Sequence, residues 1–164
     1  MNLLVQNNYL YSDLGQYTCA VGRHGLTKDK IEGDHKTPVG KYKFKKIFYR
    51  ADKLGELIFN IPSKTISKND GWCDDPKNKY YNQYIQFPFE ASAEHLYRED
   101  DLYDILCVIN YNTDPIIPGK GSAIFLHISK PNFEGTEGCV AIEKSNMIEL
   151  AKVIDSKTEL LIKI

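Results

Sequence analysis

The sequence predicts a mainly β fold with minor α content, arranged as a sandwich or a barrel-like domain. Short runs rich in Val, Ile, Tyr and Phe recur along the 164 residues, separated by turn sequences such as NDG and TDPIIPGKG. The 11 glycines and 7 prolines are spread along the chain rather than gathered in a linker. Only one segment, which follows Ser145, has apolar residues at clear helical spacing.

Nine segments have the composition of strands, and in chain order they are 3–6, 17–21, 41–44, 57–60, 84–87, 104–111, 123–128, 140–142 and 159–164. The main helix is predicted from a cap at Ser145 to about Asp155, because Met147, Leu150 and Ile154 fall near one helical face. A shorter helix is predicted at 92–98. There is no internal repeat or low-complexity tract, so we expect one domain over residues 1–164.

Composition excludes several classes of function. Hydrophobic residues make up 42% and charged residues 26%, as in ordinary globular proteins, and the net charge is −1. No basic block is longer than KFKK at 43–46, so the footprint of a nucleic-acid-binding protein is missing. No segment approaches the roughly 20 apolar residues of a membrane helix. The first residues lack the basic start of a signal peptide, so we expect a cytoplasmic protein, or a periplasmic or cell-wall one if a leader has been removed.

The four cysteines lie in different surroundings. Cys19 and Cys107 are inside apolar runs and are expected to be buried structural thiols. Cys73 lies in a polar segment, and Cys139 lies in a turn behind Gly138. No C-x-x-C pair occurs, which argues against zinc-ribbon and thioredoxin-type sites. In a cytosolic compartment all four would be reduced, whereas a Cys73–Cys139 disulfide is an open alternative.

A cysteine and a histidine at one end of the predicted sheet could carry nucleophilic catalysis. The strand at 123–128 leads His127 into a polar loop that returns to Cys139 after twelve residues. Such chemistry needs a thiolate, a base that generates it and donors for the oxyanion. Gly138 permits close approach of a substrate, and the N–H groups of Gly138 and Cys139 are natural oxyanion donors. The alternative is a buried thiol and an unrelated core histidine.

Three stretches together resemble the YkuD family of L,D-transpeptidases, also called the ErfK/YbiS family. They are GRHGLTKDKIEGDHKTPVGKYKF (22–44), PGKGSAIFLHIS (118–129) and TEGCVAI (136–142), and the resemblance extends over about residues 17–154. It implies a β-sandwich-like catalytic domain whose cysteine attacks the bond between a diamino acid, often meso-diaminopimelate, and D-Ala in peptidoglycan stem peptides. In this resemblance Cys139 matches the nucleophile and His127 the base that activates it.

The chain departs from the family pattern beside the cysteine. Glu137 stands where relatives commonly have a second histidine, and Ala141 stands where they have a polar residue. Glu137 is predicted to contact a substrate amine or to steady a nearby cation, and a solvent-facing turn residue is the alternative.

Other residues are candidates for binding the substrate. Arg23 could anchor a carboxylate, because guanidinium groups bind carboxylates bidentately, although an exposed surface arginine would look the same. Trp72 and Asp74 fall in a segment that resembles a recognition loop, and Tyr111 could lie on the rim of the cleft or simply end a strand. No zinc-peptidase or phosphate-loop pattern occurs, so neither a metal nor a cofactor is expected.

The leading functional hypothesis is a cysteine acyl-transfer enzyme whose partner is a peptidoglycan stem peptide or muropeptide. With water as acceptor it would be an L,D-carboxypeptidase of muropeptide recycling, and with an amine it would be a transpeptidase forming 3→3 crosslinks. The absence of a visible leader favours hydrolysis. An inactive peptidoglycan-binding module is the remaining alternative. We expect a monomer that binds neither nucleic acid nor membrane.

Overall fold

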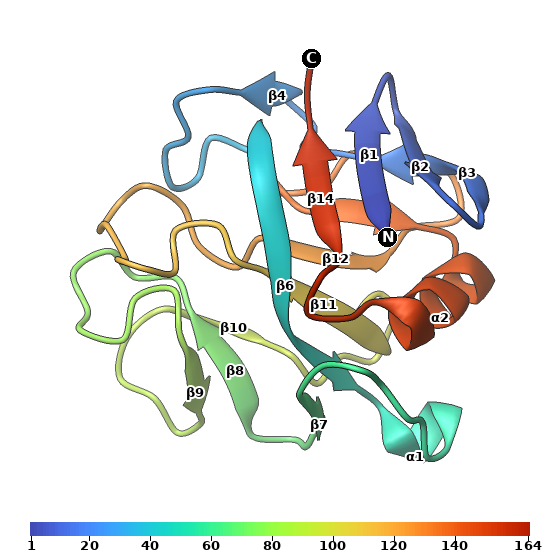
Figure 1. The fold of residues 1–164 in the computed structure, drawn as a ribbon. Helices are drawn as coiled ribbons and strands as arrows, with labels where there is room; N and C mark the ends of the chain where they lie inside the picture. The colour runs from blue at the N-terminus through green and yellow to red at the C-terminus, as the bar shows by residue number, and fades with distance from the viewer.

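A nine-stranded sheet dominates the computed structural model, which describes residues 1–164 (Figure 1). Neighbouring strands in this sheet follow the order β11 (Ile105–Ile109), β12 (Phe125–Ile128), β13 (Val140–Ile142), β3 (Gly15–Ala20), β2 (Tyr9–Ser12), β1 (Asn2–Gln6), β14 (Glu159–Ile162), β6 (Gly40–Tyr49) and β7 (Ser63–Thr65). Because β11 also pairs with β6, the sheet closes on itself as a barrel. The prediction of a mainly β fold is confirmed, in its barrel-like form.

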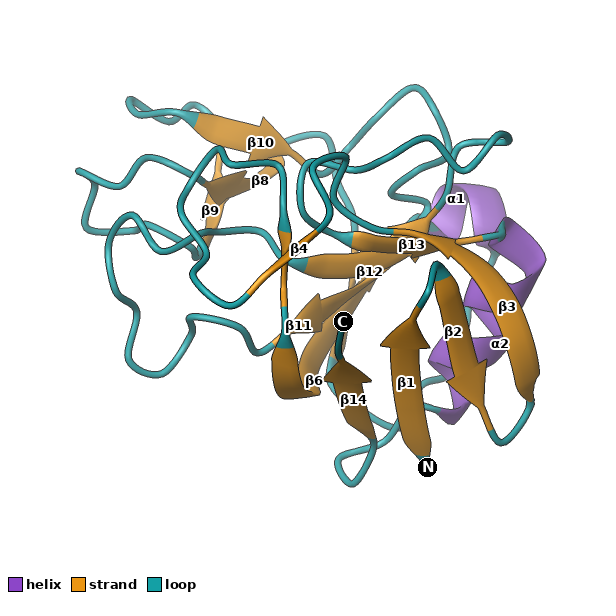
Figure 2. Cartoon of the chain, turned by 90° about the horizontal axis from the view of Figure 1, so that it is seen from above, coloured by secondary structure: helices purple, strands orange, loops and turns teal.

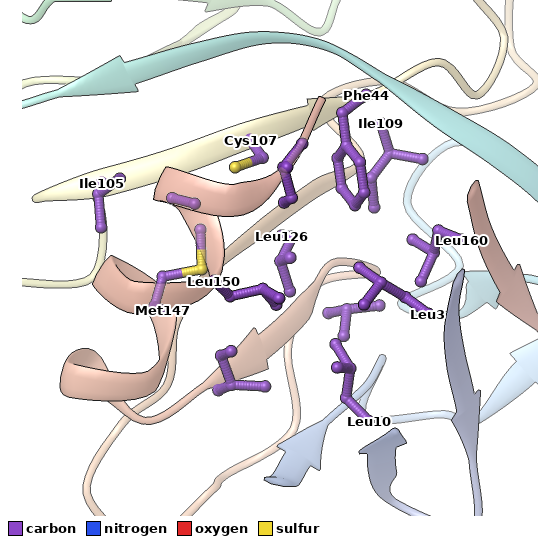
Figure 3. Close-up of a cluster of buried hydrophobic side chains, with 14 of the residues drawn as sticks. Leu3, Leu10, Phe44, Ile105, Cys107, Ile109, Leu126, Met147, Leu150 and Leu160 are labelled. Carbon is purple, nitrogen blue, oxygen red and sulfur yellow. The ribbon is translucent and has the colours of Figure 1, made fainter. Parts of the chain in front are cut away.

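The barrel is filled by alternate side chains of its strands. Side chains from β1, β6, β11, β12 and β14, such as Leu3, Phe44, Ile105, Leu126 and Leu160, meet in one buried cluster (Figure 3). This is the period of two expected for strands with one face on a core. Burial of each such side chain contributes about 1.5–3 kcal/mol to folding before entropy is counted.

Helix α2 (Lys144–Val153) covers one side of the barrel. Met147, Leu150 and Ala151 are buried on its inner face, and Figure 3 shows Met147 and Leu150 beside Leu126. The main helix after Cys139 is therefore confirmed. Its cap is Glu143 rather than Ser145, because the Glu143 side chain accepts hydrogen bonds from the backbone N–H groups at the start of the helix. Neither helix of the chain is long and apolar enough to cross a membrane.

A three-stranded sheet packs against the outside of the barrel. It consists of β10 (Ala93–His95), β8 (Asp70–Cys73) and β9 (Tyr84–Gln86), and Figure 2 shows it on the opposite side of the molecule from α2. A second buried cluster joins the two parts, with Trp72 of β8 edge-on to Phe125 of β12 at 5.2 Å between ring centroids. The outer face of β12 is thus covered by a separate layer of side chains.

Three further sequence predictions about local structure are wrong. The segment 92–98 is not a helix, because Ala93–His95 forms β10 by pairing with β8. The segment 57–60 forms no strand, and Phe59 instead packs its ring on Tyr49 at 5.1 Å. Cys73, expected in a loop, ends a fully buried strand.

Several short elements complete the chain. They are β4 (Leu26–Thr27), β5 (Thr37–Pro38) and α1 (Ala51–Leu54). At the N-terminus, Asn7 and Asn8 both have positive φ, at 53° and 60°, and join β1 to β2. Two such residues form the tight turn whose twist suits a hairpin.

Candidate active site

A cleft of about 420 Å³ lies on the outer side of the barrel, where β12 and β13 approach β10. Cys139 and His127 both line it. The alternation of β12 places them there, because Leu126 and Ile128 point into the barrel while Phe125 and His127 point outward. β12 and β13 are parallel neighbours, with His127 paired to Ala141, so the start of β13 carries Cys139 to the same face.

The Cys139 side chain is a buried, protonated thiol. Its sulfur donates a hydrogen bond to the Ala123 carbonyl at 3.1 Å and accepts one from the Phe125 N–H at 3.4 Å. Burial raises the pKa of Cys139 to about 12, and the Glu94 carboxyl acts in the same direction. Cys139 therefore rests as a thiol near neutral pH, and a base would have to remove its proton for the sulfur to act as a nucleophile.

All four cysteines are free, so the Cys73–Cys139 disulfide considered from the sequence does not form. Cys19 and Cys107 are buried in the barrel core, as predicted.

Two threonines hold the backbone of Cys139. Thr136 Oγ1 accepts from the Gly138 N–H at 3.1 Å and donates to the Cys139 carbonyl at 2.7 Å. Thr37 Oγ1 donates to the same carbonyl at 3.2 Å. Gly138 has a φ of 140°, and a Cβ there would lie 3.0 Å from the Lys36 carbonyl oxygen, so a side chain would strain the turn.

This turn decides which backbone donor is available to an oxyanion. The Gly138 N–H, one of the two donors expected from the sequence, is already bonded to Thr136 Oγ1. The Cys139 N–H makes no hydrogen bond within the chain. Of the two expected donors, the Cys139 N–H is the one left free to face a negatively charged oxygen.

The structure fixes the tautomer of His127. Its Nδ1 lies 2.8 Å from the Ile128 carbonyl oxygen, and because a carbonyl can only accept, Nδ1 carries the proton. In the neutral ring Nε2 therefore carries the lone pair. The Ile128 backbone carbonyl orients the ring. Burial lowers the pKa of His127 to about 4, so the imidazole is neutral and able to act as a base at ordinary pH.

A carboxyl and a phenol that sequence reasoning missed lie beside this pair. The Tyr103 ring packs edge-on to His127 with centroids 5.2 Å apart, and its hydroxyl donates a hydrogen bond to Glu94. Burial raises the pKa of Glu94 to about 7, against the lowering effects of the Tyr103 hydrogen bond and of Arg98. Both side chains line the cleft. Glu94 is thus a carboxyl that changes charge near neutral pH next to the candidate nucleophile.

At the rim of the cleft, Glu137 pairs with two basic side chains. Its carboxylate oxygens lie 3.4 Å from Arg23 Nη2 and 2.7 Å from His35 Nδ1, while the side chain stays 74% exposed. These contacts fit the predicted role of steadying a neighbouring cation, and the exposure fits the alternative of a solvent-facing turn residue. Arg23 also lines the cleft, with its side chain half exposed, and His35 bonds to its guanidinium at 3.0 Å.

The other predicted binding residues are divided between the cleft and elsewhere. Asp74 lines the cleft, and its Oδ1 is buried without a hydrogen-bond partner. Trp72 does not reach the cleft, because β8 turns it into the second core cluster, where its Nε1 donates to Asn82. Tyr111 also lies elsewhere, with its hydroxyl bonded to the Lys120 carbonyl at 2.5 Å. No group of three or more His, Cys, Asp or Glu side chains converges in a way that could hold a metal ion.

One family model and two solved structures are similar to this chain. The family model described as the YkuD L,D-transpeptidase catalytic domain matches residues 3–162. Two solved structures are similar at 18% sequence identity: Bd1075 of Bdellovibrio bacteriovorus, with a TM-score of 0.49 over 98% of this chain, and the helical cell shape determining protein Pgp2 of Campylobacter jejuni, with 0.48 over 99%. The match covers 46% of each of those chains, so this chain spans about half their length. No curated protein matches the sequence.

Proposed function

The chain belongs to the YkuD family of L,D-transpeptidase catalytic domains, and from this premise we propose that it is a cysteine acyl-transfer enzyme acting on peptidoglycan stem peptides. The observation that carries the proposal is the presence, in one cleft, of a buried thiol and a neutral imidazole that is protonated on Nδ1. In the proposed reaction Cys139 is the nucleophile and His127 the general base.

The proposed first half-reaction forms a thioester. His127 Nε2 takes the proton of Cys139 as the sulfur attacks the carbonyl carbon of the diamino acid, and the carbonyl electron pair moves onto oxygen, which faces the Cys139 N–H. When the carbonyl re-forms, the bond to D-Ala breaks and the imidazolium gives its proton to the leaving amine. The neutral resting states of both groups fit this order, because the charges arise only as the reaction proceeds.

For the second half-reaction we propose water as the acceptor, which makes the enzyme an L,D-carboxypeptidase. His127 would deprotonate the water, the thioester would be hydrolysed, and Cys139 would regain its proton. The size of the cleft supports this choice, since about 420 Å³ is at the lower end of the roughly 300–1,000 Å³ range of single-ligand sites. A transpeptidase must also hold a second stem peptide.

The charges that line the cleft also suit the end of a stem peptide. Arg23 offers a guanidinium for the carboxylate of the leaving D-Ala. Asp74 and Glu94 offer carboxyl groups for an ammonium on the diamino acid.

Incubation with a soluble disaccharide tetrapeptide, followed by mass spectrometry, tests the proposal. Loss of D-Ala alone supports a carboxypeptidase, and a dimeric product would show a transpeptidase instead. Cys139→Ala and His127→Asn should each abolish turnover, whereas Cys73→Ala, which removes a buried cysteine outside the cleft, should not. Turnover by Cys139→Ala would refute the mechanism.

Two further arms address the alternatives. Faster turnover of the soluble muropeptide than of intact sacculi would support a role in muropeptide recycling. Tight binding of either material with no product from the wild type would favour an inactive binding module.

A further inference from the structure

Lys30 is a buried lysine whose ammonium is held in a fixed place. Its side chain is 3% exposed, and Nζ donates to Asp34 Oδ1 at 2.5 Å and to the Ile31 carbonyl at 3.1 Å. Asp34 also accepts from the N–H groups of Ile31 and Lys36. Although burial acts to raise the pKa of Asp34, the hydrogen bonds from Lys30 and the backbone lower it, so the carboxylate stays charged. The two residues form an ion pair inside the loop that precedes β5.

This ammonium lies against the turn that carries the nucleophile. A Cβ on Gly138 would lie 3.6 Å from Lys30 Nζ, and a Cβ on Gly121 would lie 2.9 Å from Lys30 Cγ. The two glycines therefore leave room for the lysine to pass beside Gly138, the residue before Cys139. An ammonium has three N–H donors, and Lys30 uses two of them on Asp34 and Ile31. Lys30 itself does not line the cleft, so a bound substrate would not touch it.

Charges of both signs act on the Cys139 thiol from different elements. Burial is the main cause of its raised pKa, the carboxyl groups of Glu94 on β10 and Glu137 raise it further, and Lys30 is the cation that lowers it. Tyr103 also acts on the thiol across the cleft. The remaining titratable groups that line the cleft are Arg23, Glu32, Asp74, Arg98, His127, Lys130 and Glu134. A fixed positive charge in a poorly solvated place acts strongly on a nearby group that becomes negative.

We propose that Lys30 is a positioning residue of the active site: its ammonium, anchored by Asp34 behind the Gly138–Cys139 turn, stabilises the negative charge that forms on Cys139 Sγ when the thiol proton moves to His127. The catalytic meaning of this inference rests on the proposed function. The effect of Lys30 on the acidity of the Cys139 thiol does not depend on that function. A lysine that only tied its loop together would leave the acidity of Cys139 unchanged.

The test compares two variants that change the charge in opposite directions. The rate of alkylation of Cys139 by iodoacetamide is measured by peptide mass spectrometry from pH 6 to 10. Lys30→Met removes the cation, so the thiol pKa should rise by about one unit and alkylation at pH 8 should slow about tenfold. Asp34→Asn leaves the cation without its counter-charge, so alkylation should become faster than in the wild type. Lys30→Arg keeps the charge and should stay close to the wild type.

The opposite signs separate electrostatics from damage to the fold. The inference is overturned if Lys30→Met and Asp34→Asn change the alkylation rate in the same direction. It is also overturned if both variants leave the rate unchanged. If Lys30→Met does not fold, as judged by circular dichroism, Asp34→Asn decides alone: faster alkylation supports the inference and an unchanged or slower rate overturns it.

This readout also distinguishes failure of the inference from failure of the proposed function. Alkylation needs no peptidoglycan. If the two variants change the alkylation rate in the expected opposite directions but the wild type does not turn over the muropeptide, the role of Lys30 stands and the proposed substrate is wrong. If turnover is found, Lys30→Met should lower kcat/KM about tenfold at pH 7 with KM unchanged, because Lys30 does not contact the substrate.

Discussion

Glu94 should make the protein less stable as the pH rises through neutrality, and Glu94→Gln should remove that loss. Its pKa is raised from 4.5 to about 7 by burial, so the folded protein binds this proton more tightly than the unfolded chain. The stability from Glu94 is therefore complete below pH 4.5 and is lost as the pH rises from 4.5 to about 7. At about 1.4 kcal/mol per pKa unit, the full loss is about 3 kcal/mol. Because Glu94 borders an open cleft, we expect about 2 kcal/mol.

The assay is urea unfolding from pH 5 to 9, followed by the fluorescence of Trp72, the single tryptophan, which pairs with Glu94 across β8 and β10. At pH 5 the variant and the wild type should agree closely, because glutamine keeps the carbonyl that accepts the Tyr103 hydrogen bond. At pH 8.5 the variant should be the more stable. Glu99→Gln removes an exposed carboxylate from the same region and should change little. Equal pH slopes for wild type and Glu94→Gln would refute the reasoning.

Three other predictions concern the base, the turn and the core. Burial lowers the pKa of His127 from 6.5 to about 4, so the unfolded chain takes up this proton at a higher pH than the folded protein. The free energy of unfolding of the wild type should therefore fall by up to about 3 kcal/mol as the pH falls from 6.5 to 4. Urea unfolding of His127→Asn should not show that loss. Thr136→Val removes both hydrogen bonds of its hydroxyl at the nucleophile turn and should lower kcat/KM about 10–100-fold in the muropeptide assay, whereas Thr136→Ser should keep most activity. Leu150→Ala should cost about 2–5 kcal/mol in urea unfolding, and Val153→Ala, on the exposed side of the same helix, less than about 0.5 kcal/mol.

The histidine and the cysteine of the site could be predicted from the sequence because each is carried by one continuous segment. The apolar run at 123–128 and the TEGC turn each contain their chemical group and the local geometry that presents it. Alternation along β12 is then enough to turn His127 outward, and parallel pairing with β13 sets Cys139 beside the same face. Nothing distant is needed for either placement.

The parts that were missed depend on pairing between distant segments. Glu94 lies in a three-residue strand, too short to show a period of its own, and it reaches the cleft because β10 pairs with β8. Trp72 was misplaced for a related reason, since the acids around it suggested a loop. In the folded chain Asp70 is fully buried, with its carboxylate bonded to Lys64 and Tyr84, so a charged residue occupies the interior of a sheet.

The pairing of β1 with β14 has a consequence for how the chain must fold. These strands lie at opposite ends of the sequence, with Asn2 opposite Glu159, and β14 also pairs with β6. Until residues 159–162 have been synthesised, β1 and β6 present two unpaired edges that another nascent copy can join. Closure therefore comes late and is slow, as expected when contacts are distant in sequence. Loss of the last strand should yield aggregates through these edges rather than a smaller barrel.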